Sequence, residues 1–179
     1  MENNFEKILF TAEQIQDLIK AMAEKINKDY AGEEVIIIGL LKGATPFMMD
    51  LIKYIDLPCQ IDFMQISSYN GGTSSTNVIF KKDIEINVID KHVIIVDDIC
   101  DSGITMNEVL NIFHGRKTKS LEFACLLDKP SRRRIEITPK YIGTTIPDGF
   151  VVGYGLDYKE YYRNLPYIAI LSPEVYENN

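Results

Sequence analysis

The sequence VIIVDDICDSGIT, from Val93 to Thr105, carries the strongest signals for a fold in this chain. Its first four residues are β-branched and apolar, which predicts a strand buried on both faces, as strands inside parallel sheets usually are. Asp97 and Asp98 follow this strand, and Thr105 with Glu108 has the spacing of a capping box that opens a helix. The stretch therefore predicts a parallel sheet with an acidic turn at the carboxyl end of one strand.

The same alternation of strands and helices extends along the chain. Residues 11–14 form a capping box before a helix with apolar residues at helical spacing. Further elements are expected as a buried strand at 34–41, strands at 60–66 and 121–127, a helix at 44–55, and short strands at 141–143, 150–154 and 168–171. We predict a single α/β domain over residues 1–179, with a mainly parallel sheet flanked by helices and joined by right-handed crossovers. The core sheet spans about 30–128, and a small hood subdomain combines the N-terminal segment with about 129–179.

Composition excludes several classes of function. The formal net charge of -7 argues against a general affinity for nucleic acid or anionic lipid, which require a basic face. Two histidines nearly exclude a histidine-built metal site or a Ser-His-Asp triad. Three cysteines without metal-ligand spacing are typical of buried thiols in a reducing cytoplasm. There is no apolar run of membrane-spanning length and no signal-peptide pattern, so a cytoplasmic protein without a membrane partner is expected.

The turn at 101–105, DSGIT, has the chemistry of an anion site. It follows a strand and opens a helix, so backbone N–H groups and the helix dipole favour an anion there. Gly103 allows close approach, and Ser102 and Thr105 can add hydroxyl donors. The GxxxxGK[ST] spacing of a Walker loop is absent from the sequence.

The two preceding carboxylates, Asp97 and Asp98, need a different partner. Two like charges about 4 Å apart repel by about 1 kcal/mol even in water. A solvated strand end would explain them without any ligand. A ligand that carries both a phosphate and ribose hydroxyls or bound Mg²⁺ would explain the whole motif, and a phosphorylated sugar has these groups.

The stretch resembles the signature of the type I phosphoribosyltransferases, in which an apolar strand, two acids and [DE]-[ST]-G-x-T follow one another. Other segments narrow the resemblance to the hypoxanthine–guanine phosphoribosyltransferases. LLKGATPF resembles the first pyrophosphate loop and SSYNGG the mobile second loop, while LLDKPSRR, IPDGFVVGYGLDY and EYYRNLPY resemble the purine side of the site. The match covers roughly residues 10 to 171 in the expected order.

The resemblance implies the type I phosphoribosyltransferase fold and a reaction in purine salvage. Phosphoribosyl pyrophosphate would give its 5-phosphoribosyl group to N9 of hypoxanthine or guanine, in the presence of Mg²⁺, to form IMP or GMP and pyrophosphate. The resemblance places the 5′-phosphate on Asp101, Ser102, Gly103, Ile104 and Thr105, and makes Asp101 the general base for purine N7. It assigns the ribose hydroxyls and Mg²⁺ to Asp97 and Asp98, although many relatives have Glu at position 97.

The remaining site residues follow from the same resemblance. For pyrophosphate they are Lys42, Gly43, Arg163, Ser68 and Tyr69, the last two in a segment expected to close over the substrates. For the purine they are Lys129, which would donate to the 6-oxo oxygen, Phe150 by stacking, Val151 through its backbone, and Asp157 near the 2-position and a second Mg²⁺. Arg132, Arg133 and Arg134 are expected to form a solvated basic turn.

Two other functions remain open on the sequence. Some proteins with this fold are RNA-binding regulators, which would require a basic surface that the net charge does not favour. A pyrimidine- or xanthine-preferring transferase is the enzymatic alternative. The family suggests a homodimer or homotetramer, and the sequence fixes neither this state nor the choice between hypoxanthine and guanine.

Overall fold

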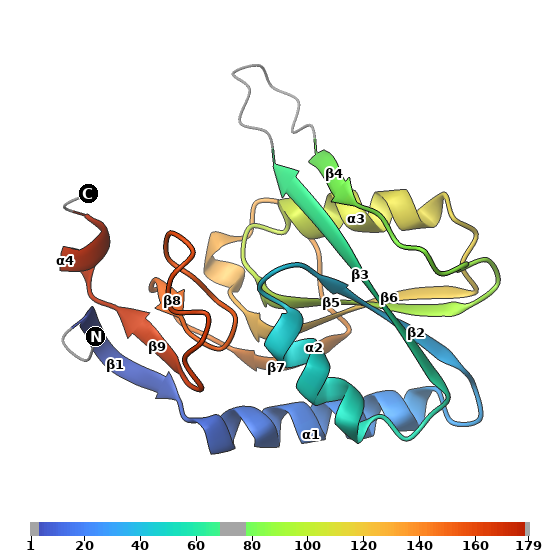
Figure 1. Cartoon of the computed structure of the whole chain (residues 1–179), viewed down its shortest axis with the longest axis horizontal. Helices are drawn as coiled ribbons and strands as arrows, with labels where there is room; N and C mark the ends of the chain where they lie inside the picture. The colour runs from blue at the N-terminus through green and yellow to red at the C-terminus, as the bar shows by residue number, and fades with distance from the viewer. Residues whose placement is uncertain (1–3, 69–77, 178–179) are drawn as a thin grey trace.

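The computed structural model describes residues 4–68 and 78–177 of the chain. A six-stranded sheet with strand order β4-β3-β2-β5-β6-β7 forms its centre (Figure 1). Its strands are β2 (Val35–Leu40), β3 (Cys59–Ser68), β4 (Val78–Lys82), β5 (His92–Cys100), β6 (Ser120–Asp128) and β7 (Tyr141–Thr145). All neighbours run parallel except β4, which is antiparallel to β3. The predicted parallel sheet is confirmed.

Helices cover both faces of this sheet: α1 (Ala12–Asp29) and α2 (Thr45–Leu51) lie on one face, and α3 (Ile104–His114) lies on the other. The 3₁₀ turn η2 (Ile52–Tyr54) continues α2, the 3₁₀ turn η3 (Pro130–Arg132) follows β6, and the short α4 (Pro173–Tyr176) lies near the C-terminus. The predicted capping box of α1 is present, because the Gln14 N–H donates to Thr11 Oγ1 at 3.3 Å and the Thr11 N–H donates to Gln14 Oε1 at 2.9 Å. Within the described residues, no helix combines the length and apolarity needed to cross a bilayer.

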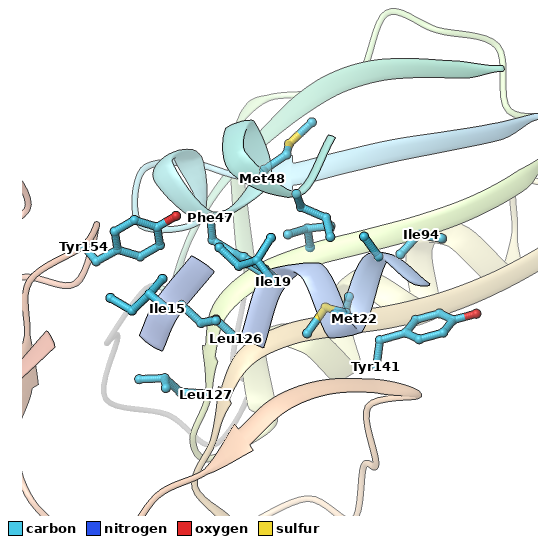
Figure 2. Packing of buried hydrophobic residues seen from close by; sticks show 14 of the residues in the cluster. Ile15, Ile19, Met22, Phe47, Met48, Ile94, Leu126, Leu127, Tyr141 and Tyr154 are labelled. Carbon is cyan, nitrogen blue, oxygen red and sulfur yellow. The ribbon is translucent and has the colours of Figure 1, made fainter. Parts of the chain in front are cut away.

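Alternate residues of the central strands enter two separate cores. On β2, Ile37 packs with α1 and α2, whereas Ile36 packs with α3. Figure 2 shows the first core, which includes Ile19 of α1, Phe47 of α2 and the sheet residue Ile94. Burying each side chain of this size stabilises the folded state by about 1.5–3 kcal/mol relative to leaving it exposed. Burial on both faces explains why the strands read as continuous apolar runs.

The hood is a separate three-stranded antiparallel sheet with order β1-β9-β8. Its strands are β1 (Phe5–Phe10), β9 (Ile168–Leu171) and β8 (Val151–Val152), so the two ends of the described chain meet in it (Figure 1). The strand expected at 141–143 does not belong to the hood. It is part of β7, which pairs with β6 at the edge of the large sheet.

Two expectations about the stretch 93–105 were wrong. The strand extends to Cys100, so Asp97 and Asp98 lie inside β5 and not in a turn beyond it. Thr105 does not cap the following helix, because α3 begins at Ile104 and its N-cap is Gly103, with φ +80°. A glycine can take this left-handed conformation without steric cost, so the helix begins two residues earlier than the capping-box spacing predicts.

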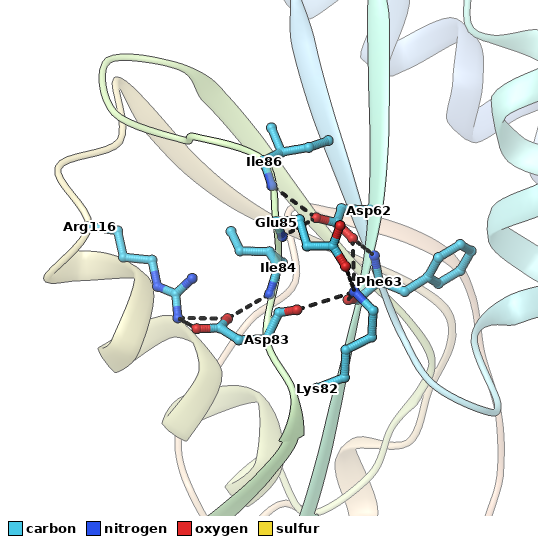
Figure 3. Close-up of polar contacts among 8 residues, drawn as sticks. All are labelled: Asp62, Phe63, Lys82, Asp83, Ile84, Glu85, Ile86 and Arg116. Atoms are coloured by element: carbon cyan, nitrogen blue, oxygen red, sulfur yellow. Dashed lines mark hydrogen bonds and ion pairs between the residues drawn. The ribbon is translucent and has the colours of Figure 1, made fainter.

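Asp62 joins the edge of the sheet to the chain that follows β4. Its carboxylate accepts backbone N–H groups of Phe63, Glu85 and Ile86 at 2.7, 2.6 and 3.1 Å, and Lys82 Nζ at 3.3 Å (Figure 3). Burial alone would raise the pKa of Asp62, but these donors lower it below its ordinary value. The ionised carboxylate therefore stabilises this edge.

Candidate active site

Three chain segments meet beyond the carboxyl ends of β2, β5 and β6, where open parallel sheets bind ligands. After β2, the Leu41–Lys42 peptide bond is cis and Gly43 follows. A Cβ added at Gly43 would collide with the carboxylate of Asp98 in β5. The predicted pyrophosphate loop and the acidic pair are therefore in direct contact, and any side chain at residue 43 would require the Asp98 carboxylate to move.

The acidic pair is held by its own backbone. The Asp98 N–H donates to Asp97 Oδ1 at 3.0 Å, and the Ile99 N–H donates to Asp98 Oδ1 at 2.8 Å. Burial raises the pKa of Asp97 well above its ordinary value, and the charge of Asp98 raises it further. Burial also raises the pKa of Asp98, against the favourable field of Arg163. Two crowded, partly buried carboxylates of this kind suit a divalent cation.

The described residues contain no cluster of three or more Asp, Glu, His or Cys side chains arranged for a metal. Mg²⁺ commonly uses one or two carboxylates together with water and substrate phosphates, so two acids are sufficient. The donor set of Asp97 and Asp98 therefore fits Mg²⁺. Asp157, the third acid expected near a metal, is already paired: its Oδ1 lies 2.7 Å from Arg163 Nη2, and its Oδ2 accepts the Glu160 N–H at 2.8 Å.

The turn at 101–105 leaves the start of α3 open to an anion. No side chain caps the helix, and the Ile104 N–H makes only a long bond of 3.4 Å to Ser102 Oγ. Asp101 Oδ1 is buried and has no hydrogen-bond partner among the described residues. The free helix N-terminus suits a phosphate, and the unpartnered carboxylate oxygen suits a ligand proton.

Lys129 follows β6 and is buried, with a side chain that is only 4% exposed. Its ammonium donates to the carbonyl of Gly149 at 2.7 Å and lies 2.9 Å from Asp148 Oδ1. The Lys129 hydrogen bond lowers the pKa of Asp148. An ammonium group has three N–H donors, so this arrangement fixes its direction and leaves a donor for a ligand.

Phe150 presents its ring at the same place. Phe150 is 37% exposed, and its ring stacks on Tyr176 with centroids 5.3 Å apart and makes a T-shaped contact with Tyr158 at 5.6 Å. An aromatic face supported from two directions is a suitable platform for a planar base.

The hood also reaches the loop after β2. Arg163 Nη1 donates to the carbonyl of Gly155 at 2.6 Å, and the backbone of Gly155 packs against the carbonyl of Gly43. Lys42 Nζ pairs with Glu160 Oε2 at 2.8 Å. The two cations predicted for pyrophosphate therefore lie at one junction between hood and core.

A cleft of about 640 Å³ lies between the hood and the carboxyl ends of the strands. The predicted residues that line it are Asp98, Asp101, Lys129, Phe150, Val151 and Asp157. Lys42, Gly43, Arg163 and Asp97 lie beside it through the contacts above, and Ser102 to Thr105 continue from Asp101 into α3. Ser68 ends β3, but its side chain and Tyr69 lie outside the described residues.

Sequence reasoning missed nine residues that line this cleft. Three of them, Ile99, Asp148 and Tyr176, lie beside predicted site residues, and the others are Glu6, Arg132, Gly149, Leu156, Ile170 and Leu171. Ile99 lies inside the quoted motif, two residues before Asp101, and could have been assigned from strand alternation. Asp148 and Tyr176 come from the hood, and the single sequence carries no signal for their contacts with Lys129 and Phe150.

The fold and the cleft define a phosphoribosyltransferase, and the phosphoribosyl transferase domain family matches residues 7–159. Curated relatives named hypoxanthine-guanine phosphoribosyltransferase are 49% identical in Staphylococcus aureus and 47% identical in Streptococcus pneumoniae. Each alignment covers 99% of this chain and at least 99% of the relative. A crystal structure of the hypoxanthine phosphoribosyltransferase of S. aureus superposes with a TM-score of 0.94 at 49% identity, covering 98% of this chain and 96% of that one. The chain belongs to the hypoxanthine-guanine phosphoribosyltransferase family.

Proposed function

We propose that this enzyme transfers the 5-phosphoribosyl group of phosphoribosyl pyrophosphate to N9 of hypoxanthine or guanine, giving IMP or GMP and pyrophosphate. One observation carries the proposal. A single cleft brings the acids Asp98 and Asp101, which precede a free helix N-terminus, together with the buried Lys129 and the exposed ring of Phe150. The first group suits a phosphorylated sugar, and the second suits a 6-oxopurine.

The sugar phosphate is assigned to the turn at 101–105. Its 5′-phosphate would accept hydrogen bonds from the backbone of Ser102 to Thr105 and from the two hydroxyl groups, supported by the dipole of α3. Asp97 and Asp98 would bind the ribose hydroxyls and Mg²⁺. When bound, Mg²⁺ supplies positive charge that stabilises the departing pyrophosphate.

Asp101 is proposed as the general base. Breaking the C1′–O bond develops positive charge on the ribose while N9 attacks, and the purine becomes more acidic at N7. The buried Asp101 Oδ1 without a partner among the described residues supports its role as the acceptor of that proton.

The purine is assigned to Lys129, Phe150, Val151 and Asp157. Lys129 would donate to the 6-oxo oxygen, the Phe150 ring would stack on the base, and the backbone of Val151 would pair with its edge. The contacts of Lys129 with Asp148 and Gly149 support this, since they hold the ammonium in one direction. Asp157 would lie near the purine 2-position and a second Mg²⁺.

Pyrophosphate is assigned to Lys42, Gly43 and Arg163, together with Ser68 and Tyr69. The meeting of Gly43 with Asp98 and of Arg163 with Asp157 supports a pyrophosphate site next to the metal-binding acids. A homodimer or homotetramer and a cytoplasmic location remain expectations from the family, which sedimentation and cell fractionation would test.

A panel of free bases, assayed with phosphoribosyl pyrophosphate and Mg²⁺, tests the proposed function. Hypoxanthine and guanine should be converted to nucleotides, and omission of Mg²⁺ should abolish the reaction. Turnover restricted to a pyrimidine or to xanthine would contradict the assignment. Retention on an RNA column at physiological salt without any turnover would favour an RNA-binding regulator.

In the same assay, Asp101→Asn distinguishes a role of Asp101 as general base from a role in binding the phosphate. The backbone of the turn is unchanged, so binding of phosphoribosyl pyrophosphate should persist while kcat falls by roughly 10²–10⁴. Asp17→Asn, on the exposed face of α1, is the matched control. Turnover near the wild-type value in Asp101→Asn would remove this residue from the mechanism.

A further inference from the structure

Residues 130–137 form a support behind the proposed phosphate-binding turn. The backbone N–H groups of Arg134 and Ile135 both donate to the carbonyl of Ser102, at 2.9 and 3.2 Å. A Cβ added at Gly103 would meet the Ile135 carbonyl at 3.0 Å and Arg133 Cδ at 3.2 Å. The turn therefore rests directly on this segment.

Arg133 in this segment is not the solvated residue that the run of three arginines predicts. Its side chain is 14% exposed. Nη1 donates to Cys100 Sγ at 2.5 Å and to the Ile137 carbonyl at 2.9 Å, while Nη2 donates to the Cys100 carbonyl at 3.3 Å and pairs with the Asp128 carboxylate. One guanidinium thus connects the ends of β5 and β6 with the supporting segment.

Arg133 contacts one residue at the end of each of two strands. Each of these comes immediately before a residue that is proposed to act on the purine. Cys100 is followed by Asp101, and Asp128 is followed by Lys129. The Lys129 N–H also donates to the Cys100 carbonyl, at 3.0 Å. Any shift of the guanidinium would change the distance between the proposed base and the proposed 6-oxo donor.

We propose that Arg133 is a positioning residue that fixes Asp101 and Lys129 relative to each other. The inference rests on the proposed function of those two residues. The planar guanidinium is suited to the task, because its fork of donors reaches several acceptors at once, and a lysine ammonium does not reproduce this geometry. A role in stability alone is a weaker explanation for the Arg133–Asp128 ion pair, because replacing a buried ion pair by apolar residues is often neutral or stabilising.

Arg133→Ala tests the inference, with Arg134→Ala as the matched control because the Arg134 side chain is exposed. A misplacement of about 1 Å can cost about 10²-fold in rate, so kcat with hypoxanthine should fall by about 10- to 100-fold. The preference for hypoxanthine over adenine should fall with it, while the KM for phosphoribosyl pyrophosphate changes less. A purely structural role would lower the active fraction and leave the base preference of the folded enzyme unchanged.

Chemical rescue adds a second readout. A surface pocket of about 200 Å³ is lined by Asp128 and Arg133 among others, so a small cation can reach the space that the truncated side chain leaves. Millimolar guanidinium should restore part of the lost kcat in Arg133→Ala, and urea, which is neutral and of similar shape, should not. Equal effects of both solutes, or a kcat of Arg133→Ala within twofold of wild type, would overturn the proposal.

Arg133→Lys covers the case in which the alanine variant does not fold. It keeps the charge and the apolar stem but lacks the planar fork, so a reduced kcat and a reduced base preference are expected. Full activity in Arg133→Lys would show that charge alone suffices and would contradict positioning. Every variant is compared with the wild type on a base that the wild type converts. If the proposed function is wrong, the wild type itself does not convert hypoxanthine or guanine. If only this inference is wrong, the wild type is active and the Arg133 variants behave like it.

Discussion

The carbonyl oxygen of Gly43 occupies the space that a Cβ of residue 155 would need. Gly155 belongs to the hood and has φ +99°, and Gly43 belongs to the loop after β2, so two glycine backbones touch where hood and core meet. Arg163 donates to the carbonyl of the same Gly155. The position of the proposed pyrophosphate loop therefore depends on the absence of a side chain more than one hundred residues away.

Gly155→Ala should displace this loop. Gly32→Ala is the matched control, because Gly32 has a similar φ of +82° and no described atom within 4 Å of an added Cβ. Both variants should lose about 1 kcal/mol through the left-handed backbone. Gly155→Ala should lose a further 1–3 kcal/mol, roughly, through the clash, and its KM for phosphoribosyl pyrophosphate should rise. Urea unfolding measures the loss of stability, and steady-state kinetics measures the change in KM. Equal stability and equal KM in the two variants would show that the loop accommodates the added methyl group at no energetic cost.

Asp97→Asn should stabilise the metal-free protein while it lowers activity. The pKa of Asp97 is raised in the folded chain, so Asp97 keeps its proton to a higher pH in the folded state than in the unfolded state. The wild type therefore loses stability as the pH rises. The amide removes this cost, which we expect to amount to about 1 kcal/mol at pH 7.5. Thermal unfolding in the presence of a chelator, at pH 7.5 and at pH 5, should show an advantage for the variant that shrinks at the lower pH. A variant less stable than wild type at pH 7.5 would contradict this account.

Lys129 should exclude adenine from the cleft. Its ammonium donates hydrogen bonds and accepts none, so an amino group at the purine 6-position would leave donors facing each other in a buried site. The wild type should prefer hypoxanthine over adenine by several kcal/mol in kcat/KM, a scale set by unpaired buried polar groups. Lys129→Gln, whose amide oxygen can accept, should reduce this preference. Efficient use of adenine by the wild type would overturn the assignment.

Asp62→Asn should weaken the edge of the sheet in a pH-dependent way. The pKa of Asp62 is lowered in the folded chain, so its contribution is complete above the unfolded pKa of about 3.9 and is lost as the pH falls through the lower folded value. The amide loses charge-assisted bonds, and the variant should be about 1.5–3 kcal/mol less stable at pH 7. Urea unfolding at pH 7 and pH 3 should show the difference narrowing in acid. The exposed Asp56→Asn is the control, and a difference that does not depend on pH would refute the explanation.

The sequence was sufficient for the parts of the site that lie on strand ends. The apolar runs predict the parallel sheet, and a parallel sheet gathers the residues after its strands at one edge, which brings Gly43, Asp98, Asp101 and Lys129 together. The capping-box spacing failed at Thr105 because a left-handed glycine starts the helix first. Two local signals conflict there, the capping-box spacing of Thr105 and the backbone freedom of Gly103, and the structure follows the glycine.

Contacts between residues far apart in the sequence could not be predicted. Arg133, Arg132 and Arg134 are chemically alike in the sequence, and only the packed structure shows that one of them reaches Cys100, 33 residues earlier. Likewise, nothing in residues 173–176 indicates that a tyrosine there will stack on Phe150. Such contacts depend on the tertiary packing of separate chain segments, which no local pattern encodes.

The ion pairs at the hood junction have a consequence for how strongly pyrophosphate can be held. Lys42 already pairs with Glu160, and Arg163 with Asp157. If both cations bind pyrophosphate as proposed, binding is an exchange of partners, in which two carboxylates are displaced and two phosphate contacts are formed. The net affinity is then lowered by whatever it costs to break the two ion pairs. Product departure is correspondingly helped, because each cation returns to a waiting carboxylate and is never left as a bare charge.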